Sequence, residues 1–171
     1  LHVSAALQDG RFATCLVDLV TAEERRAEAR SGRPRYRIPI LVERLAETLD
    51  WLRAQPELGS LPVGCFGASS GAAVALVLAA LRPASIRAVV CRGGRPELAG
   101  ALLQRVQAPI LFIVGEHDAG VLAANAEAFE EVSVPKDLAV IPGAGHLFEE
   151  PGTLDEVGRL ALGWFSLHLR H

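Results

Sequence analysis

The sequence predicts an α/β fold in which a mostly parallel sheet carries helices on both faces. Five strand-like runs, at 12–19, 61–66, 86–91, 109–114 and 136–141, alternate with stretches of helical character. Most of these runs are apolar at successive positions, which is typical of strands buried on both faces. Strands that alternate with helices along a chain form parallel sheets.

Length and composition limit the classes of protein to which the chain can belong. At 171 residues it has the size of one domain, which we assign to residues 1–171, and half of its residues are apolar. A formal net charge of −3 gives no electrostatic basis for binding nucleic acid. The most apolar stretch, 71–81, is far shorter than the ~20 residues that a membrane-spanning helix needs. We therefore expect a small-molecule partner rather than nucleic acid or a membrane.

The three cysteines indicate a reducing compartment. Cys15, Cys65 and Cys91 are widely spaced, and each lies in or at the end of an apolar run. This spacing differs from that of metal ligands, so we expect buried, reduced thiols rather than ligands or disulfides. Together with the lack of a visible signal peptide, such thiols suit a cytoplasmic protein.

The first part of the chain begins with a helical pattern. No capping residue and no methionine precede this pattern at Leu1, so we expect further residues upstream, and Gly10 is the expected C-terminal cap. A strand is expected at 12–19. The segment 21–37 is rich in Glu and Arg and is expected to form a solvated helical turn and loop.

The later helices follow from proline positions and apolar spacing. Pro39 and Pro96 each open a helix. Residues 72–81 are apolar on every side, which indicates a helix that is buried all round. Thr153 and Glu156 have the spacing of a capping box at the start of the last helix.

The turn before that buried helix has the pattern G-x-S-x-G, with Ser69 between Gly67 and Gly71. Its place between a strand and a helix is the context of a nucleophile elbow. The serine there has a strained backbone that pushes its hydroxyl out of the sheet, and the glycines avoid side chains that would collide. The N–H of Ser70 begins the helix and points toward an oxyanion formed by attack of Ser69. The alternative is a glycine-rich turn with a structural serine.

Three residues with complementary chemistry follow three different strands. Ser69, Asp118 and His146 come after the strand-like runs at 61–66, 109–114 and 136–141. Ligands of parallel sheets bind outside the carboxyl ends of the strands.

These residue types together make a nucleophilic triad. Serine needs an adjacent base, histidine can supply it, and a carboxylate orients the imidazole. The chain order Ser, Asp, His accompanies this kind of elbow. Taken singly, Asp118 could be the N-cap of the next helix and His146 a loop histidine. His117 is a rival base, although its side chain should point away from that of its neighbour Asp118.

The segments 67–71, 114–118 and 142–148 resemble those of the α/β-hydrolase superfamily. The compact size and the short segments between the three residues most resemble the dienelactone-hydrolase branch, and the likeness covers essentially the whole chain. The resemblance implies Ser69 as nucleophile, Asp118 as orienting acid and His146 as base.

The resemblance also carries an expected activity. Dienelactone hydrolases proper have a cysteine nucleophile, so the serine here shifts the expected substrates toward small carboxylic esters or lactones. We expect a serine esterase that works through an acyl-enzyme, without a metal or organic cofactor.

One part of the superfamily's pattern is absent. In the superfamily a central strand leads into a His-Gly type loop that donates a second oxyanion N–H, and no such strand precedes Leu1. Loss of one oxyanion donor typically lowers the rate ~10²–10³-fold. We therefore expect the native protein to be longer at its N-terminus. The alternatives are a catalytically silent binding or regulatory domain, and an acyltransferase that uses the same triad.

Arg92 and Arg95 flank a Gly-Gly turn at the carboxyl end of another strand. One of them could face the pocket and bind an anionic group of the substrate. The alternative is a surface turn whose arginines pair with Glu97, Glu149 or Glu150. The sequence leaves the acyl group, the leaving group and the oligomeric state open.

Overall fold

The computed structural model describes residues 1–31 and 38–169, so the end of the predicted loop at 21–37 lies outside the described residues. In chain order the elements are α1 (His2–Asp9), α2 (Ala22–Ser31), α3 (Ile38–Arg53), β1 (Val63–Ala68), α4 (Ser70–Leu81), β2 (Ile86–Arg92), the 3₁₀ segment η1 (Pro96–Arg105), β3 (Ile110–Gly115), α5 (Ala119–Glu131), β4 (Lys136–Ile141) and α6 (Thr153–Leu169).

The strands of the described residues form one parallel sheet of four strands, in the order β1-β2-β3-β4. Neighbours in the sheet are therefore also successive strands of the chain, and a helical element connects each pair. The register places Val90 of β2 beside Leu111 of β3, and Ile113 of β3 beside Ala139 of β4. The predicted α/β class with a mostly parallel sheet is confirmed.

The strand predicted at 12–19 is wrong. The segment is irregular, and none of the described strands pairs with it. Phe12 packs against the apolar cluster on one face of the sheet, whereas Leu19 packs against the cluster on the other. An apolar run becomes a strand only where a neighbouring strand exchanges backbone hydrogen bonds with it. Here the segment passes from one face to the other instead.

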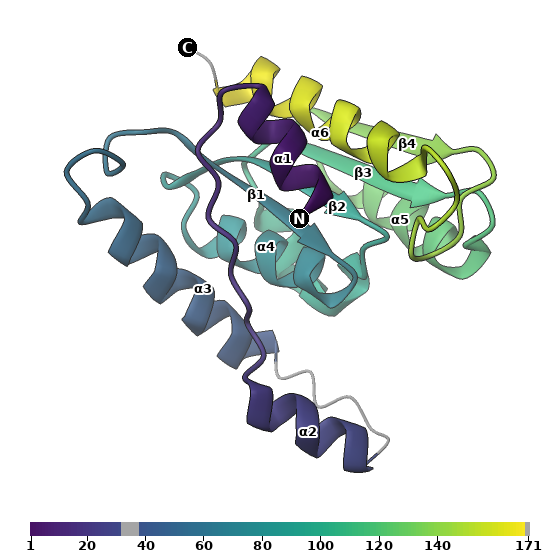
Figure 1. Ribbon diagram of the computed structural model, residues 1–171, viewed down its shortest axis with the longest axis horizontal. Coiled ribbons are helices and arrows are strands. Elements are labelled where there is room, and N and C mark those ends of the chain that lie inside the picture. The colour runs from purple at the N-terminus through teal and green to yellow at the C-terminus, as the bar shows by residue number, and fades with distance from the viewer. Residues whose placement is uncertain (32–37, 170–171) are drawn as a thin grey trace.

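Helices cover both faces of the sheet, as predicted (Figure 1). α1 and α6 lie together on one face, and α3, α4, η1 and α5 lie on the other. All six residues of β3 are buried between these two layers. Residues 72–80 of α4 are buried on every side, because α4 is enclosed by the sheet, α3 and η1. The predicted all-round burial of this helix is confirmed.

α2 extends away from the body of the molecule (Figure 1) and is held by polar contacts. Its first turn is a capping box, in which the Thr21 N–H donates to the Glu24 carboxylate at 2.8 Å and the Glu24 N–H donates to Thr21 Oγ1 at 3.1 Å. Arg44 of α3 donates to the same carboxylate at 2.8 Å and to the Leu19 carbonyl at 2.6 Å. The hydrogen bonds from Arg44, and then that from Thr21, lower the pKa of Glu24 to about 2.

The capping box predicted at the start of α6 is wrong. Thr153 is buried, and its hydroxyl donates to the Glu150 carbonyl at 2.7 Å. The Glu156 carboxylate accepts two hydrogen bonds from Arg159, at 2.7 Å and 2.5 Å. Both partners of the predicted box are therefore bonded elsewhere.

The cysteines are all free thiols, but they differ in burial. Cys91 is buried and Cys65 is half-buried in the sheet, and burial raises the pKa of Cys65 to about 12 and that of Cys91 likewise upward. Cys15 is exposed, so its predicted burial is wrong. The reason is that the segment 12–19 does not enter the sheet.

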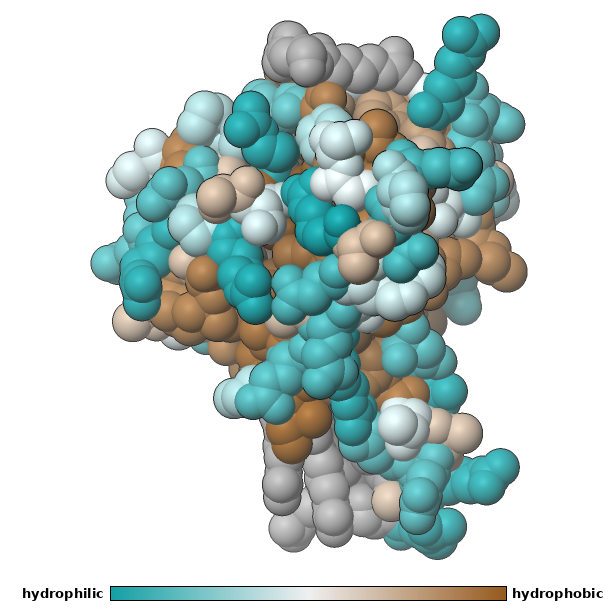
Figure 2. Space-filling view, turned by 90° about the vertical axis from the view of Figure 1, so that its left-hand side faces the viewer, coloured by the Kyte–Doolittle hydropathy of each residue, from teal (hydrophilic) through white to brown (hydrophobic). Residues whose placement is uncertain are grey.

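Apolar patches reach the surface among polar side chains on the side of the molecule that Figure 2 shows. Among the described residues, the exposed large apolar side chains are Leu1, Leu16, Val17, Trp51, Leu61, Leu81, Val140, Leu147 and Leu167. None of the helices in the described ranges has the length and apolarity to span a bilayer.

Candidate active site

Ser69 occupies the tip of the turn between β1 and α4 in a backbone conformation that few L-residues adopt. Its φ is 52° and its ψ is −125°, which stores roughly 1–3 kcal/mol of strain. At Gly67 a Cβ would lie 2.4 Å from the Gly71 carbonyl oxygen and 2.6 Å from Ala72 Cα, so a larger residue would collide with backbone. The predicted strained elbow is thereby confirmed.

Gly71 does not have the steric role that the pattern predicts. A Cβ at Gly71 would meet nothing within 4 Å. The close approach in this turn is required of Gly67 alone, because it is the Gly71 backbone that the Gly67 Cβ would strike.

The backbone of Ser69 is bonded on both sides to the turn that follows β2. The Ser69 N–H donates to the Arg92 carbonyl at 3.1 Å, and the Arg95 N–H donates to the Ser69 carbonyl at 3.1 Å. Ser70 is the first residue of α4, so its N–H has no acceptor within the helix. Because Ser69 is the N-cap residue of α4, the helix N-terminus and this N–H directly follow it in the chain.

Asp118 and His146 meet at the carboxyl end of the sheet. His146 Nδ1 lies 2.6 Å from Asp118 Oδ2, which is a hydrogen bond from the ring when Nδ1 carries the proton. The Asp118 side chain is only 16% exposed, whereas the His146 side chain is 41% exposed. The carboxylate is therefore sheltered, and the ring reaches solvent with Nε2 on its opposite edge.

This contact distinguishes between the alternatives for Asp118. Asp118 does occupy the N-cap position of α5, but its side chain makes no capping hydrogen bond. His117 is exposed and lies 4.0 Å from Glu116 Oε2. The carboxylate of Asp118 is thus bonded to His146, and His117 points elsewhere.

Two loops are joined so that this contact can form. The Glu116 N–H donates to the Ile141 carbonyl at 3.0 Å, and the His117 N–H donates to the Ala144 carbonyl at 2.9 Å. At Gly115 a Cβ would lie 2.4 Å from the Ala144 carbonyl oxygen, so the loops approach too closely for any other residue.

Two glutamates brace the loop that carries His146. The Glu116 carboxylate accepts from the Gly143 N–H at 2.7 Å, and the Glu150 carboxylate accepts from the Gly145 N–H at 3.0 Å. The sequence indicated no role for Glu116 or Gly115. It offered Glu150 only as a possible partner of Arg92 or Arg95. A glycine at the end of a fully apolar strand was the available signal for the close approach, whereas nothing in the pattern indicated that the glutamates brace this loop.

The side chain of Ser69, the third predicted residue, is not hydrogen-bonded to Asp118 or His146 in the described structure. Ser69 and His146 are linked through Gly93 and its neighbours: a Cβ at Gly93 would lie 3.6 Å from His146 Nδ1 and Cε1, and Arg92 accepts from the Ser69 N–H. Both residues therefore border the same turn.

Arg92 and Arg95 have different surroundings. Arg92 donates to the Leu147 carbonyl at 3.3 Å and lies over the Phe148 ring at 5.3 Å from its centroid, and burial lowers its pKa. Arg95 is bonded to Glu97 at 2.5 Å, which is one of the pairings expected for a surface turn. Phe148, which sequence reasoning did not single out, is buried at a positive φ of 57°.

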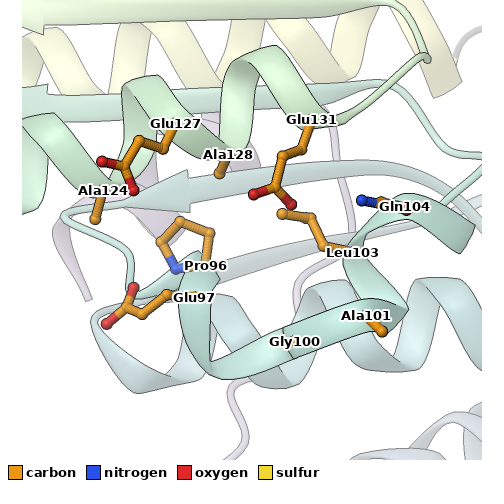
Figure 3. A pocket seen from close by; sticks show the side chains of 10 residues that line it. All are labelled: Pro96, Glu97, Gly100, Ala101, Leu103, Gln104, Ala124, Glu127, Ala128 and Glu131. Carbon is orange, nitrogen blue, oxygen red and sulfur yellow. The ribbon is translucent and has the colours of Figure 1, made fainter.

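A cavity of about 310 Å³ lies elsewhere, between η1 and α5 (Figure 3). Glu97, Glu127 and Glu131 lie around it. Its lining does not include Ser69, Asp118 or His146. The described side chains contain no group of three or more His, Cys, Asp or Glu that could hold a metal ion.

Known proteins resemble this chain over nearly its whole length. Two Mycobacterium tuberculosis proteins, one from each of two strains, are named "Putative phosphoribosyl transferase" and are 49% identical to it over 168 residues. The match covers 98% of this chain and 37% of theirs, so the chain spans about 37% of the length of these curated relatives.

Solved structures resemble it as well. A dienelactone hydrolase from Anabaena variabilis is 47% identical, with a TM-score of 0.93 over 99% of this chain and 78% of that one. A monoacylglycerol lipase from Paleococcus ferrophilus shares the fold at 19% identity, with a TM-score of 0.61 over 77% of this chain and 76% of that one.

The family assignment follows from a match to the sequence itself. Residues 20–159 match the family described as "Dienelactone hydrolase family", and this range includes both loops and the elbow. The chain has the α/β-hydrolase fold and belongs to the dienelactone hydrolase family.

Proposed function

We propose that this chain is a serine hydrolase that cleaves small carboxylic esters or lactones through an acyl-enzyme. Ser69 is the nucleophile, His146 the general base and acid, and Asp118 the residue that orients the imidazole. The observation that carries the proposal is the 2.6 Å contact between Asp118 and His146 at the same end of the sheet as a strained serine elbow.

Each step uses a group of this chain. His146 Nε2 takes the proton as Ser69 Oγ attacks the ester carbonyl, and the tetrahedral intermediate collapses when the leaving alcohol receives that proton. Asp118 holds the proton on Nδ1, which keeps Nε2 in its basic form and stabilises the imidazolium. Water then attacks the acyl-enzyme by the same route and releases the acid.

The oxyanion of the tetrahedral intermediate needs donors that are already in place. Ser70 supplies one, because its N–H begins α4 and the partial positive charge of the helix N-terminus adds to it. For an anionic group on the substrate we favour Arg92 over Arg95, since Arg92 contacts the loop of His146 while Arg95 is bonded to Glu97. No metal or organic cofactor takes part in this chemistry.

The missing hydrogen bond between Ser69 and His146 is compatible with the proposal. In unliganded enzymes catalytic hydrogen bonds are often long and shorten only when the substrate is bound. The His146 side chain is 41% exposed, and its ring is hydrogen-bonded to Asp118.

The test combines covalent labelling with turnover. Wild type, Ser69→Ala and His146→Ala are treated with a fluorophosphonate probe and assayed with p-nitrophenyl acetate. Wild type should be labelled at Ser69, and each substitution should lower kcat by several orders of magnitude. Equal turnover by all three proteins would overturn the proposal.

A second candidate is a hydrolase-like domain that binds a ligand without turnover. Two observations favour it: Ser69 and His146 are not hydrogen-bonded, and the longer curated relatives carry the name of a different activity. Rapid probe labelling of Ser69 would exclude this candidate. Ligand binding that survives Ser69→Ala, with no labelling of wild type, would support it.

A further inference from the structure

The turn formed by residues 92–95 joins the two halves of the candidate site. It accepts a hydrogen bond from the Ser69 N–H through Arg92 and donates one to the Ser69 carbonyl through Arg95, both at 3.1 Å. The Gly93 N–H also donates to the Ile113 carbonyl of β3 at 2.8 Å. The position of Ser69 is therefore tied to the position of this turn.

The same turn passes close to the imidazole of His146. Gly93 has a φ of 50°, and a Cβ built there would lie 3.4 Å from the His146 carbonyl oxygen and 3.6 Å from Nδ1 and Cε1 of its ring. These are ordinary contact distances for a Cβ, so a side chain at Gly93 would touch the ring and the backbone of the turn passes close to it. A shift of the turn consequently changes the distance between Ser69 and His146.

The buried side chain of Asn125 is hydrogen-bonded to this turn. Asn125 of α5 is 0% exposed, and its Nδ2 donates to the Gly94 carbonyl at 2.9 Å and to the Val121 carbonyl at 2.7 Å. Gly94 is itself buried, and a Cβ there would lie 2.8 Å from the Ala72 Cβ. A buried carbonyl must be hydrogen-bonded, and Asn125 meets that requirement from a different element of the fold.

The chemistry of Asn125 favours this role over simple packing. Its Oδ1 is buried and has no hydrogen-bond partner among the described residues. An apolar side chain of similar size would avoid that unfavourable burial. Asparagine is thus suited to this position by its N–H donors, and one of them holds the turn.

We propose that Asn125 is a positioning residue, which fixes the turn at 92–95 and thereby sets the geometry between Ser69 and His146. The catalytic part of this inference rests on the hydrolase function proposed above. The structural part, that Asn125 controls the surroundings of the His146 ring, does not depend on turnover.

The test uses Asn125→Leu, which keeps the approximate volume and removes the donor. Because a misplacement of about 1 Å can lower a rate 10²-fold, kcat for p-nitrophenyl acetate should fall roughly 10–100-fold while KM changes less than about twofold. The NMR signal of the His146 ring, assigned by its loss in His146→Gln, should shift in Asn125→Leu.

Val132→Ala is the matched control. Val132 is the buried C-cap residue at the other end of α5 and packs in an apolar cluster with Ala128, so its truncation destabilises the helix without touching the turn. It should lower the melting temperature but leave kcat and the His146 ring signal unchanged. Equal effects of the two substitutions on ring signal and kcat, at equal loss of melting temperature, would reduce Asn125 to a packing residue and overturn the proposal.

The two proposals fail in different ways. If wild type shows neither labelling nor turnover, the hydrolase function fails, while a shifted His146 signal in Asn125→Leu still supports the positioning role. An unshifted signal overturns that role whatever the activity. Should Asn125→Leu not fold, Asn125→Ser, which is small and polar and too short to reach the Gly94 carbonyl, carries the same measurements.

Discussion

Two apolar runs of this chain differ in structure: β3 is a buried strand, whereas the segment 12–19 is irregular and largely exposed. Every residue of β3 is buried, and it pairs with β2 on one side and β4 on the other. Residues 15–18 are all exposed, and the described structure offers the segment no strand to pair with. Apolar composition is therefore a condition for a buried strand, and neighbouring strands are the second condition.

An aspartate near the end of each of these two runs differs in exposure in the same way. Asp18 lies near the end of the first run, is 63% exposed and bonds Arg25 at 2.6 Å. Asp118 follows β3, is 16% exposed and bonds His146 at 2.6 Å. A fixed strand end presents its carboxylate to another loop of the fold, whereas the carboxylate of the unpaired segment bonds groups nearby in sequence, the Val20 N–H and Arg25 of α2.

The largest expected effect is on turnover, where substitution of Asp118 and substitution of Asp18 should differ. Asp118→Asn should lower kcat for p-nitrophenyl acetate roughly 10³–10⁴-fold, because the amide no longer holds the proton on His146 Nδ1. Asp18→Asn, the matched change, should leave kcat within about twofold of wild type. The measurement is steady-state kinetics on both variants with thermal melting as the folding control.

Similar loss of activity in both variants would show that the Asp118 carboxylate has no more part in turnover than the exposed Asp18 carboxylate. Unchanged activity in Asp118→Asn would show that the contact with His146 has no catalytic part.

The next effect is a difference in stability between the two runs. Phe112 in the middle of β3 is 0% exposed and packs edge-on against Phe129, so Phe112→Ala should lower the free energy of unfolding by about 3–5 kcal/mol. Leu16 is 63% exposed, so Leu16→Ala should change it by less than about 0.5 kcal/mol. Chemical denaturation of both variants gives the two values. A loss at Leu16 that approaches the loss at Phe112 would mean that the first run is buried in solution.

Much of the sheet could be predicted because each strand carries its own signals. The runs at 86–91 and 136–141 are mostly apolar and are bounded by glycines or prolines, and the structure has strands at Ile86–Arg92 and Lys136–Ile141. The all-apolar pattern of 72–80 likewise specifies burial without reference to any partner. Local sequence was sufficient in these places because burial of apolar surface is favourable and these segments have neighbours to pack against.

The remaining features depend on parts of the fold that are distant in sequence. The absence of a strand at 12–19 depends on which backbone lies beside it. The hydrogen bond from Asn125 depends on where the turn at Gly94 is placed, and the bracing of the His146 loop by Glu150 depends on how that loop is folded. The contact of Asp118 with His146 could be anticipated, because parallel strands bring their carboxyl ends to one edge.

The two candidate capping boxes show that even a short local motif can depend on tertiary structure. Thr153 and Glu156 have the required spacing but bond Glu150 and Arg159 instead. Thr21 and Glu24 have it too and do form the box. The difference is tertiary, because Thr153, the first residue of α6, is buried while Thr21 is exposed.

The smallest expected effect compares the carboxylates at the starts of α2 and α6. Glu24 has a folded-state pKa of about 2, below its ordinary value of 4.5, chiefly because Arg44 donates hydrogen bonds to it. Its contribution to α2 is therefore complete above pH 4.5 and is lost as the pH falls toward 2. Hydrogen exchange of the α2 amides should accelerate across that window in wild type, and Glu24→Gln should show the fast exchange already at pH 7 after correction for intrinsic rates.

Glu156→Gln is the matched change in α6. The pKa of Glu156 is also lowered, by its hydrogen bonds with Arg159, but α6 buries Val157, Ala161 and Phe165 against the sheet. Apolar packing rather than one carboxylate stabilises that helix, so its amides should keep their protection in the variant at pH 7. Loss of protection in α6 equal to that in α2 would contradict the view that α2 is held by polar contacts and α6 by its buried face.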